Sequence, residues 1–348
     1  MIKKMISMAY LSLSYAMKPG FLKKRSWVNF FMALVIIFSF GLNCIAAGSL
    51  PKERVFFIEE RIMFKNLSPG TQNVHLWIPY PVNDGLQAID NFKLEGPFSS
   101  KVITDKEYGN RILYLVARRG ALNGNNSGII ITFKVQRKEY GISDRELSSG
   151  RPLKQFLESD RLVPVNGEIK KLAQKITQGK GGDLEKVRAI YDYLIDELTY
   201  YRDDPKICGI GDSLLTLQYK KGICTDYHSL FISLVRSLGI PAKFEIGFRI
   251  PEDTREGKLN GYHCWAKFYL EDKGWVPVDI SEADKHPEKK DYFFGRIDEN
   301  RVHLTSGRDI VLAYAQDSPP LNFFVYPYAE LGGERFDTIE TDISFKQK

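Results

Sequence analysis

The chain has 348 residues, of which 43% are hydrophobic and 26% are charged, as in a globular protein with room for two domains. Its formal net charge of +6 has one source, because residues 1–50 hold six basic and no acidic residues, while the remainder has 43 of each. A neutral body gives no electrostatic reason to expect a nucleic-acid partner.

The first 48 residues have the pattern of a targeting segment. Basic residues precede an apolar run over 28–42, and small residues around Ala46 follow it. This order is typical of a secretory signal peptide, and Met17 begins a shorter version of it. An uncleaved N-terminal membrane anchor is the alternative, since the run approaches spanning length. We therefore expect an exported protein, periplasmic or extracellular, that reaches the membrane only through residues 1–48.

Three cysteines follow that segment: Cys208, Cys224 and Cys264. An odd number in an exported monomer leaves at least one free thiol. A Cys208–Cys264 disulfide is compatible with this count. Lipidation at Cys44 is a weaker alternative, because the residues before it are a poor lipidation context.

Residues 51–142 have the pattern of a β-domain. Short alternating apolar stretches are separated by turns rich in Gly, Asn and Pro, without helical periodicity between them. This spacing predicts a β-sandwich of about a hundred residues. The strands we expect cover residues 55–64, 73–78, 111–116 and 129–135.

The pattern changes after residues 143–167, a charged stretch with Gly and Pro that we interpret as a linker. Helices come first and an antiparallel meander follows, which indicates the α+β class with helices packed on one side of a sheet. We assign residues 168–348 to this second domain. The expected helices cover 168–178, 183–200 and a segment from Cys224, and the expected strands cover 242–250, 262–270 and 274–280.

The sequence pattern does not determine the secondary structure of two further segments. The tail from Asp291 is rich in aromatic residues, and we expect it to add edge strands or to lie back over the second domain. The connection over 251–260 joins two expected strands. Both segments are expected to border a substrate cleft.

Cys224 lies at the expected start of an amphipathic helix, and Gly222 permits a tight backbone approach just before it. Free N–H groups and the positive end of the helix dipole at such a position favour a thiolate over a thiol. Cys224 is therefore a candidate nucleophile.

A cysteine nucleophile needs a base and a group that orients the base. His263 lies in one expected strand and Asp279 in the next, so a hairpin can place them side by side. A helix N-terminus laid across that sheet would bring Cys224 to the imidazole. The sequence therefore predicts a Cys224–His263–Asp279 triad.

The residues around this triad resemble the bacterial transglutaminase-like superfamily over roughly residues 150–315. The resemblance implies a papain-like core in which Cys224 is the nucleophile, His263 the base and Asp279 its orienter. It implies acyl transfer on peptide or carboxamide substrates, by hydrolysis or by transamidation, with no cofactor and no metal. The β-domain also resembles the one that precedes this core in several exported members. The matching motifs are Gly222-x-Cys224-x-Asp226, Leu234-x-x-x-Leu238-Gly239-Ile240-Pro241-Ala242, His263-x-Trp265 and Gly274-Trp275-Val276-Pro277-Val278-Asp279.

Some details depart from that pattern or are left open by it. Cys264 stands where many members have a small residue, and we expect its side chain to point away from His263. Asp226 is interpreted as a first-turn charge that favours the helix. The Cys224 N–H is an expected oxyanion donor. The candidates for a second donor are Tyr200, Tyr201 and Tyr219.

Four alternatives to this reading stay open at the level of sequence. Cys224 can be a buried structural cysteine. Cys224 and His228, four residues apart on one helix, can share a zinc ion with His263 or Asp279. His228 can replace His263 as the base. Finally, the chain can be a binding or scaffolding protein of the cell envelope that keeps the papain-like fold without turnover.

Overall fold

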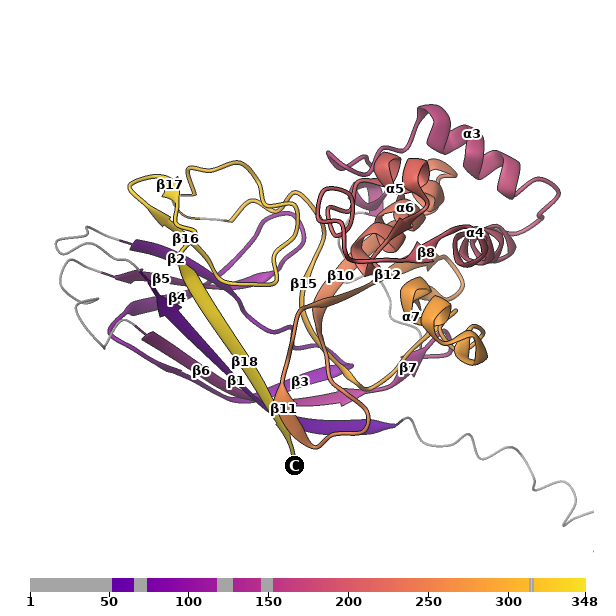
Figure 1. Cartoon of the computed structure of the whole chain (residues 1–348). Helices are drawn as coiled ribbons and strands as arrows, with labels where there is room; N and C mark the ends of the chain where they lie inside the picture. The colour runs from indigo at the N-terminus through magenta and orange to yellow at the C-terminus, as the bar shows by residue number, and fades with distance from the viewer. Residues whose placement is uncertain (1–51, 66–73, 118–127, 145–152, 313, 315) are drawn as a thin grey trace, which may run out of the picture. The chain divides into compact units, whose positions relative to one another are not determined.

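The computed structural model describes residues 52–65, 74–117, 128–144, 153–312, 314 and 316–348 (Figure 1). The predicted targeting segment, residues 1–48, lies outside these ranges. Within them, no helix combines the length and the apolar character that a membrane crossing requires. Residues 51–348 form one compact unit.

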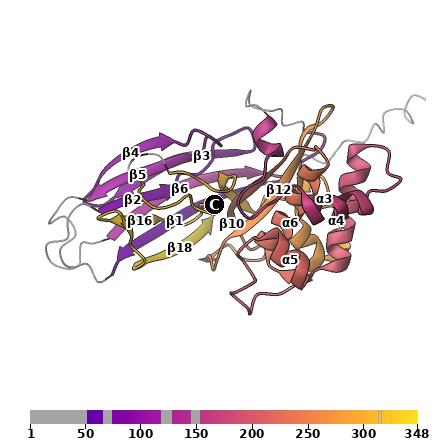
Figure 2. The same cartoon turned by 90° about the horizontal axis from the view of Figure 1, so that it is seen from above.

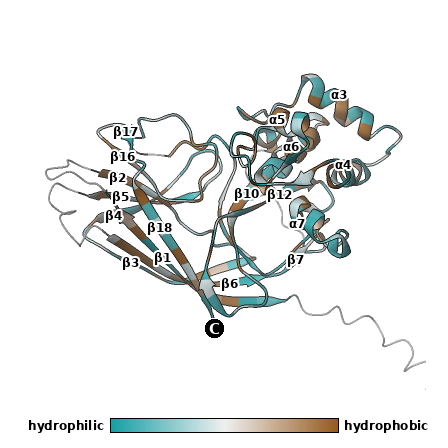
Figure 3. Cartoon of the chain, in the orientation of Figure 1, coloured by the Kyte–Doolittle hydropathy of each residue, from teal (hydrophilic) through white to brown (hydrophobic). Residues whose placement is uncertain are grey.

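The N-terminal domain consists of two five-stranded antiparallel sheets that share a hydrophobic core. Along β1, Phe56, Ile58 and Ile62 point inward and alternate with more exposed residues, and the strands in Figure 3 show the same banding. The four predicted strands are present. The strands of this region are β1 (Glu53–Phe64), β2 (Val74–Pro79), β3 (Gln87–Glu95), β4 (Ser99–Thr104), β5 (Arg111–Ala117) and β6 (Gly128–Lys138).

The predicted boundary of the second domain needs a correction, because the end of the chain returns to the sandwich. Strand β18 (Ile339–Gln347) pairs antiparallel with β1 from Phe56↔Gln347 to Phe64↔Ile339. In the other sheet, β16 (Tyr328–Leu331) lies between β2 and β17 (Glu334–Arg335). These pairings satisfy backbone groups that would otherwise leave sheet edges open. The last part of the tail, residues 328–347, therefore completes the first domain.

The second domain is α+β, as predicted, with helices against a four-stranded antiparallel sheet in the order β13-β12-β10-β15 (Figure 2). Helix α6 packs on β12 and β10 and is buried along its whole length. The helices are α3 (Gly167–Ile176), α4 (Asp183–Glu197), α5 (Ser213–Tyr219), α6 (Cys224–Ser237) and α7 (Ile280–Lys285), with 3-10 turns η2 (Leu153–Leu157) and η3 (Pro287–Lys289). The sheet strands are β10 (Ala242–Arg249), β12 (His263–Leu270), β13 (Gly274–Val278) and β15 (Arg301–Ser306).

Five short strands also lie in or border this half. Strand β8 (Thr199–Tyr200) pairs in parallel with β9 (Lys221–Gly222) just before α6. Strand β7 (Tyr140–Gly141) pairs with β14 (Arg296–Ile297) and so joins the two domains. Within the expected cleft loop, β11 (Glu256–Lys258) pairs with β18 of the sandwich. The loop over 251–260 is thus anchored to the first domain.

The predicted linker, residues 143–167, is also corrected where it is described after the gap, over residues 153–167. Phe156 is buried, and its ring meets Trp275 edge to face at 5.0 Å. Arg236 of α6 donates hydrogen bonds to the Glu158 carbonyl and to the Asp160 carboxylate, each at 2.8 Å. This segment therefore packs against the core of the second domain.

Gly247 lies where β10 approaches β15 closely. A Cβ at this position would lie 1.8 Å from the Val302 carbonyl oxygen on β15. Because a backbone atom cannot yield as a flexible side chain does, we expect Gly247→Ala to lower the free energy of unfolding in urea by about 3 kcal/mol. Gly257→Ala on β11 is the control, since its Cβ would meet only Phe345 at 3.7 Å. Equal effects of the two changes would contradict the tight β10–β15 approach.

Candidate active site

Cys224 is the first residue of α6 and is 2% exposed. The chain reaches it through Gly222, whose added Cβ would lie 2.5 Å from the Asp226 side chain. The Asp226 carboxylate accepts hydrogen bonds from the N–H groups of Ile223 at 2.8 Å, Gly209 at 2.7 Å and Gly211 at 2.8 Å. Asp226 therefore fixes the start of the helix and fastens the preceding loop to it, which requires glycine at position 222.

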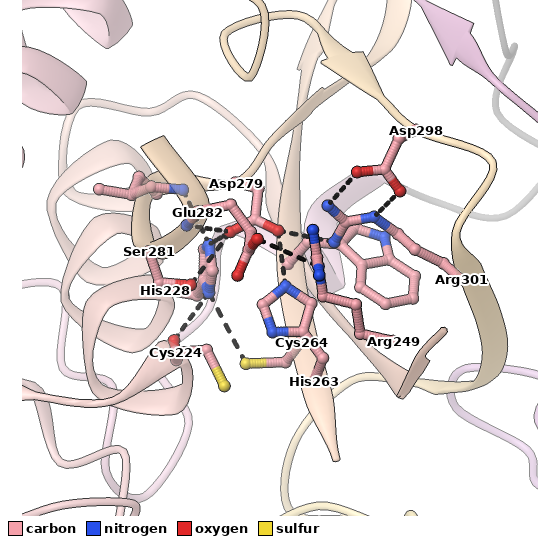
Figure 4. A network of polar contacts seen from close by, with 12 residues as sticks. Cys224, His228, Arg249, His263, Cys264, Asp279, Ser281, Glu282, Asp298 and Arg301 are labelled. Carbon is pink, nitrogen blue, oxygen red and sulfur yellow. Dashed lines mark hydrogen bonds and ion pairs between the residues drawn. The ribbon is translucent and has the colours of Figure 1, made fainter. Parts of the chain in front are cut away.

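His263 and Asp279 lie side by side, as the hairpin argument predicted. His263 Nε2 is 2.6 Å from Asp279 Oδ2, and both residues are buried (Figure 4). Asp279 is not within a strand, however. It is the N-cap of α7, and its Oδ1 accepts from the Glu282 N–H at 3.0 Å and from the Ser281 hydroxyl at 3.0 Å. The carboxylate is thus held by a helix start that follows β13.

His263 Nδ1 is the ring nitrogen left for Cys224, because Nε2 is engaged by Asp279. Hydrogen bonds from the Cys264 thiol and from the His263 imidazole lower the pKa of Cys224 well below its usual range, although burial opposes this. Burial disfavours charge on His263, but Asp279 and Cys224 outweigh it and raise the pKa of His263 to about 9. The site therefore favours a thiolate–imidazolium pair at neutral pH.

His228 is held by the backbone instead of facing the thiol. Its Nδ1 lies 2.7 Å from the Cys224 carbonyl oxygen, and its Nε2 accepts from the Ile280 N–H at 3.1 Å. These contacts fix the neutral tautomer that carries a proton on Nδ1. Burial accordingly lowers the pKa of His228. Neither ring nitrogen is left to act as the base or to bind a zinc ion, so His228 is a positioning residue for the start of α6.

Cys264 lies closer to the site than we expected. Its Sγ is 3.6 Å from His228 Nδ1 and 3.9 Å from the Thr225 hydroxyl, both within the first five residues of α6. The Cys264 side chain therefore lies against the start of α6. Strand alternation turns its side chain away from the face of His263, but α6 covers that second face. Cys208, Cys224 and Cys264 are all free, without a Cys208–Cys264 disulfide.

Arg301 belongs to the site, and sequence reasoning missed it. This β15 residue is fully buried, and its Nη1 is 2.6 Å from Asp279 Oδ2. Asp298 accepts from the same guanidinium at 3.3 and 3.4 Å, and the Trp265 ring lies 5.2 Å from it. One sequence feature could have indicated it, the charged pair Asp298-x-x-Arg301. The strand that carries Arg301 was not predicted, because the aromatic-rich tail was not divided into elements.

The three tyrosines that are candidates for a second oxyanion donor differ in their surroundings. Burial and the charge of Cys224 raise the pKa of Tyr200, whose hydroxyl accepts from Arg202 at 3.3 Å. Tyr219 is 46% exposed on α5, and Tyr201 packs beside Lys221. Because the charge of Cys224 acts on Tyr200, we retain Tyr200 as the candidate for the second oxyanion donor.

The aromatic tail also reaches this region. Burial, followed by the charge of Cys224, raises the pKa of Tyr326 to about 12. The Tyr326 ring meets Tyr262 at 6.3 Å, and the Tyr262 hydroxyl lies 2.7 Å from that of Thr225. The tail thus contributes an aromatic side chain near the thiol.

A helix that begins at a cysteine and packs on an antiparallel sheet carrying a histidine–aspartate pair is a papain-like arrangement. Residues 170–280 match the model of the transglutaminase-like superfamily, a range that contains Cys224, His263 and Asp279. The chain therefore contains a transglutaminase-like domain, as the motifs predicted. Arg301 lies outside the matched range.

Similarity to other proteins reaches beyond the matched domain. An uncharacterized protein of Haemophilus influenzae is 27% identical over 313 residues, covering 78% of this chain and 84% of its own. The uncharacterized protein YebA of Bacillus subtilis is 28% identical over 132 residues, covering 34% of this chain and 18% of its own. A candidate cysteine protease of Cytophaga hutchinsonii has a similar fold, with a TM-score of 0.55 and 16% identity over 85% of this chain and 98% of that one.

The lowered pKa of Cys224 predicts an unusual pH profile for alkylation. An ordinary thiol of pKa about 8.5 is about 3% ionised at pH 7, so its alkylation rate rises about 25-fold between pH 7 and pH 9. We expect the rate for Cys224 to rise less than about twofold over that range, because the thiolate is already present at pH 7. Iodoacetamide labelling read by mass spectrometry measures this, with a cysteine-containing peptide as the ordinary thiol. A 25-fold rise at Cys224 would show that the ion pair does not form.

Proposed function

We propose that the protein is an exported thiol enzyme that cleaves carboxamide or peptide bonds through an acyl-enzyme. Cys224 Sγ attacks the carbonyl carbon, and the His263 imidazolium gives its proton to the departing amine. The resulting thioester is then attacked by water, in hydrolysis, or by a second amine, in transamidation, and His263 takes the proton of that nucleophile. Asp279 orients the imidazole. The contact of a helix-start thiolate with a buried His263–Asp279 pair carries this proposal.

The oxyanion of the tetrahedral intermediate needs donors that are already in place. The first turn of α6 supplies free N–H groups, including that of Cys224, because no earlier carbonyl can accept from them within the helix. We assign the Tyr200 hydroxyl as the second donor. Its backbone is fixed beside Gly222 through the β8–β9 pair.

Tyr200→Phe tests this assignment without touching the thiol. We expect acylation by an activated p-nitrophenyl ester to slow by about 10²-fold, because one oxyanion donor is lost. Iodoacetamide forms no oxyanion, so the alkylation rate of Cys224 should stay within about twofold of the wild type. Tyr201→Phe is the matched control and should leave both rates unchanged. A parallel loss in both reactions would mean that Tyr200 supports the structure of the site instead.

The cellular place and the substrate class follow from other features. The order of basic, apolar and small residues in the first 48 residues supports export, so peptides of the cell envelope are natural acyl donors. The domain match and the fold support a papain-like amide-transfer chemistry. The mechanism uses side chains alone, and none of its steps requires a metal or cofactor.

Iodoacetamide labelling at pH 7 separates this proposal from a binding or scaffolding role. We expect rapid labelling confined to Cys224, and a loss of about tenfold or more in His263→Ala, because the imidazolium no longer favours the thiolate. Slow labelling that His263→Ala does not change would favour the non-catalytic alternative. Incubation with peptide and cell-wall libraries, followed by mass spectrometry of the Cys224 thioester, then identifies the acyl donor.

A further inference from the structure

A second thiol lies beside the proposed nucleophile. Cys264 is fully buried on β12, and its Sγ faces the first turn of α6, next to Thr225 and His228. Figure 4 shows both sulfur atoms between the helix and the strand, and Cys264 is the largest influence that lowers the pKa of Cys224. The acyl-transfer steps leave the Cys264 thiol without a chemical task. A thiolate beside a neutral thiol can become a disulfide once an oxidant takes two electrons from the pair and the thiol proton is lost.

We propose that Cys224 and Cys264 form a peroxide-oxidisable dithiol in which Cys264 is the resolving thiol. The Cys224 thiolate attacks one oxygen of hydrogen peroxide, the O–O bond breaks, and the hydroxide that leaves takes the His263 proton to become water. The product is a sulfenic acid on Cys224. Cys264 Sγ then attacks the Cys224 sulfur, the S–O bond breaks, and the thiol proton leaves with the hydroxyl as a second water. Two thiols are oxidised and one peroxide is reduced.

The contacts explain why Cys264 is the partner. A disulfide requires the two sulfur atoms about 2 Å apart. Cys264 Sγ lies 3.9 Å from the hydroxyl of Thr225, the residue that follows Cys224, so it is already at the start of α6. Cys208 sits in the loop before α5, where its N–H donates to the Asp204 carbonyl at 2.9 Å.

The disulfide would have two consequences at this site. It would occupy Cys224 Sγ and so stop acyl transfer, a consequence that rests on the proposed function. It would also divert the sulfenic acid from the irreversible sulfinic acid, so that a thiol reductant restores the nucleophile. The proposal therefore describes a reversible oxidation site.

Trypsin makes the test direct, because it places each cysteine on its own peptide. The full-length protein is treated with hydrogen peroxide, blocked with iodoacetamide and digested without reductant. We expect a cross-linked pair of the Cys224 and Cys264 peptides, lighter than their sum by two hydrogen atoms, and its loss after dithiothreitol. The peptides are 26–52 for Cys44, 207–220 for Cys208, 222–236 for Cys224 and 259–267 for Cys264.

Cys264→Ser removes the resolving thiol but keeps a hydrogen-bond donor beside Cys224. We expect peroxide to convert Cys224 in this variant to a sulfinic acid, heavier by two oxygen atoms, with less than a tenth of its labelling recovered by dithiothreitol. Wild type and Cys208→Ser should recover more than nine-tenths. Sulfinic acid on wild-type Cys224, or a disulfide to Cys208, would overturn the proposal.

Phenylarsine oxide provides a measurement on the wild type alone, should Cys264→Ser fail to fold. A trivalent arsenical bridges two adjacent thiols, so one equivalent should protect the Cys224 and Cys264 peptides together from alkylation. Protection of Cys224 alone would contradict the dithiol. These readouts are masses and do not depend on turnover. A protein that forms the disulfide but shows no His263-dependent labelling would retain this inference while losing the proposed function.

Discussion

Asp279→Asn is expected to slow acylation by an activated ester by about 10³–10⁴-fold. Asp279 accepts four hydrogen bonds: Oδ2 from His263 and Arg301, and Oδ1 from Ser281 and the Glu282 N–H. Asparagine has one acceptor oxygen, so its NH₂ group must face two of these four donors. Whichever way the amide turns, one pair of donors loses its acceptor.

The two orientations of the asparagine have different costs, and both damage the site. If the NH₂ group faces His263, the imidazole must turn or change tautomer, and Nδ1 no longer presents the correct form to Cys224. If it faces the start of α7, that helix loses its cap, at a cost of about 1 kcal/mol. Loss of the carboxylate charge also lowers the pKa of His263 from about 9, because Asp279 is the largest factor that raises it.

Stopped-flow acylation and the pH profile of Cys224 alkylation measure these effects together. In Asp279→Asn we expect alkylation to regain the steep rise between pH 7 and pH 9 that ordinary thiols show. Asp284→Asn on α7 is the matched control, because Asp284 accepts from the Tyr227 hydroxyl at 3.0 Å and lies outside the His263 contacts. An Asp279→Asn protein that folds, acylates within tenfold of the wild type and keeps the flat profile would exclude the assigned role.

Local sequence patterns predicted the parts of the site that depend on short-range order. The motif and the periodicity predicted the helix that begins at Cys224 and the neighbouring positions of His263 and Asp279, because each depends on one element or on one hairpin. The end of the hairpin strand was harder to place. Asp279 is the cap of α7 because its side chain, together with Ser281, can satisfy the first N–H groups of a helix. A six-residue helix leaves little periodicity from which to detect that cap.

Long-range pairing accounts for most of what the sequence did not predict. Strand β18 joins β1 across almost the whole chain, and nothing in its own alternation indicates which strand it will pair with. Strands β3 and β4 are edge strands with mostly exposed side chains, so they lack the apolar alternation that identifies a strand. The contact of Cys264 with Cys224 depended on the helix that covers its face. The contact of Arg301 with Asp279 depends on the pairing of β15 with β10, which the sequence pattern did not predict.

Arg301→Met is expected to lower the free energy of unfolding by about 3–5 kcal/mol, because it leaves two buried carboxylates without their shared cation. Arg301 and Asp279 are both fully buried, and Asp298 is 5% exposed. Methionine has a similar unbranched shape, so the loss measures charge and hydrogen bonding more than volume. Urea unfolding at pH 7 provides the measurement. Arg301→Lys should recover part of the loss, since it restores one charge but not the planar guanidinium.

The pH dependence of Arg301→Met provides a second, independent readout. Despite burial, His263 and Arg301 hold the pKa of Asp279 well below its usual range. A carboxylate with a depressed folded-state pKa contributes stability above its unfolded pKa of about 3.9, and that contribution is lost as the pH falls through the folded-state value. Removing Arg301 raises the folded-state pKa, so less of this stabilisation remains. We therefore expect acid unfolding of Arg301→Met to begin at a higher pH than in the wild type.

Arg249→Met separates this effect from the general loss of an arginine on the sheet. Arg249 lies on β10, its side chain is 26% exposed, and it pairs with Glu282 at 3.0 Å and with Glu252 at 3.1 Å. Lys285 also pairs with Glu282, so that carboxylate keeps a cation after the change. We expect Arg249→Met to cost less than about 1 kcal/mol, as for partly exposed pairs. Equal losses in the two variants would mean that Arg301 acts as one more surface-type ion pair, and that the His263–Asp279 pair does not depend on a buried cation behind it.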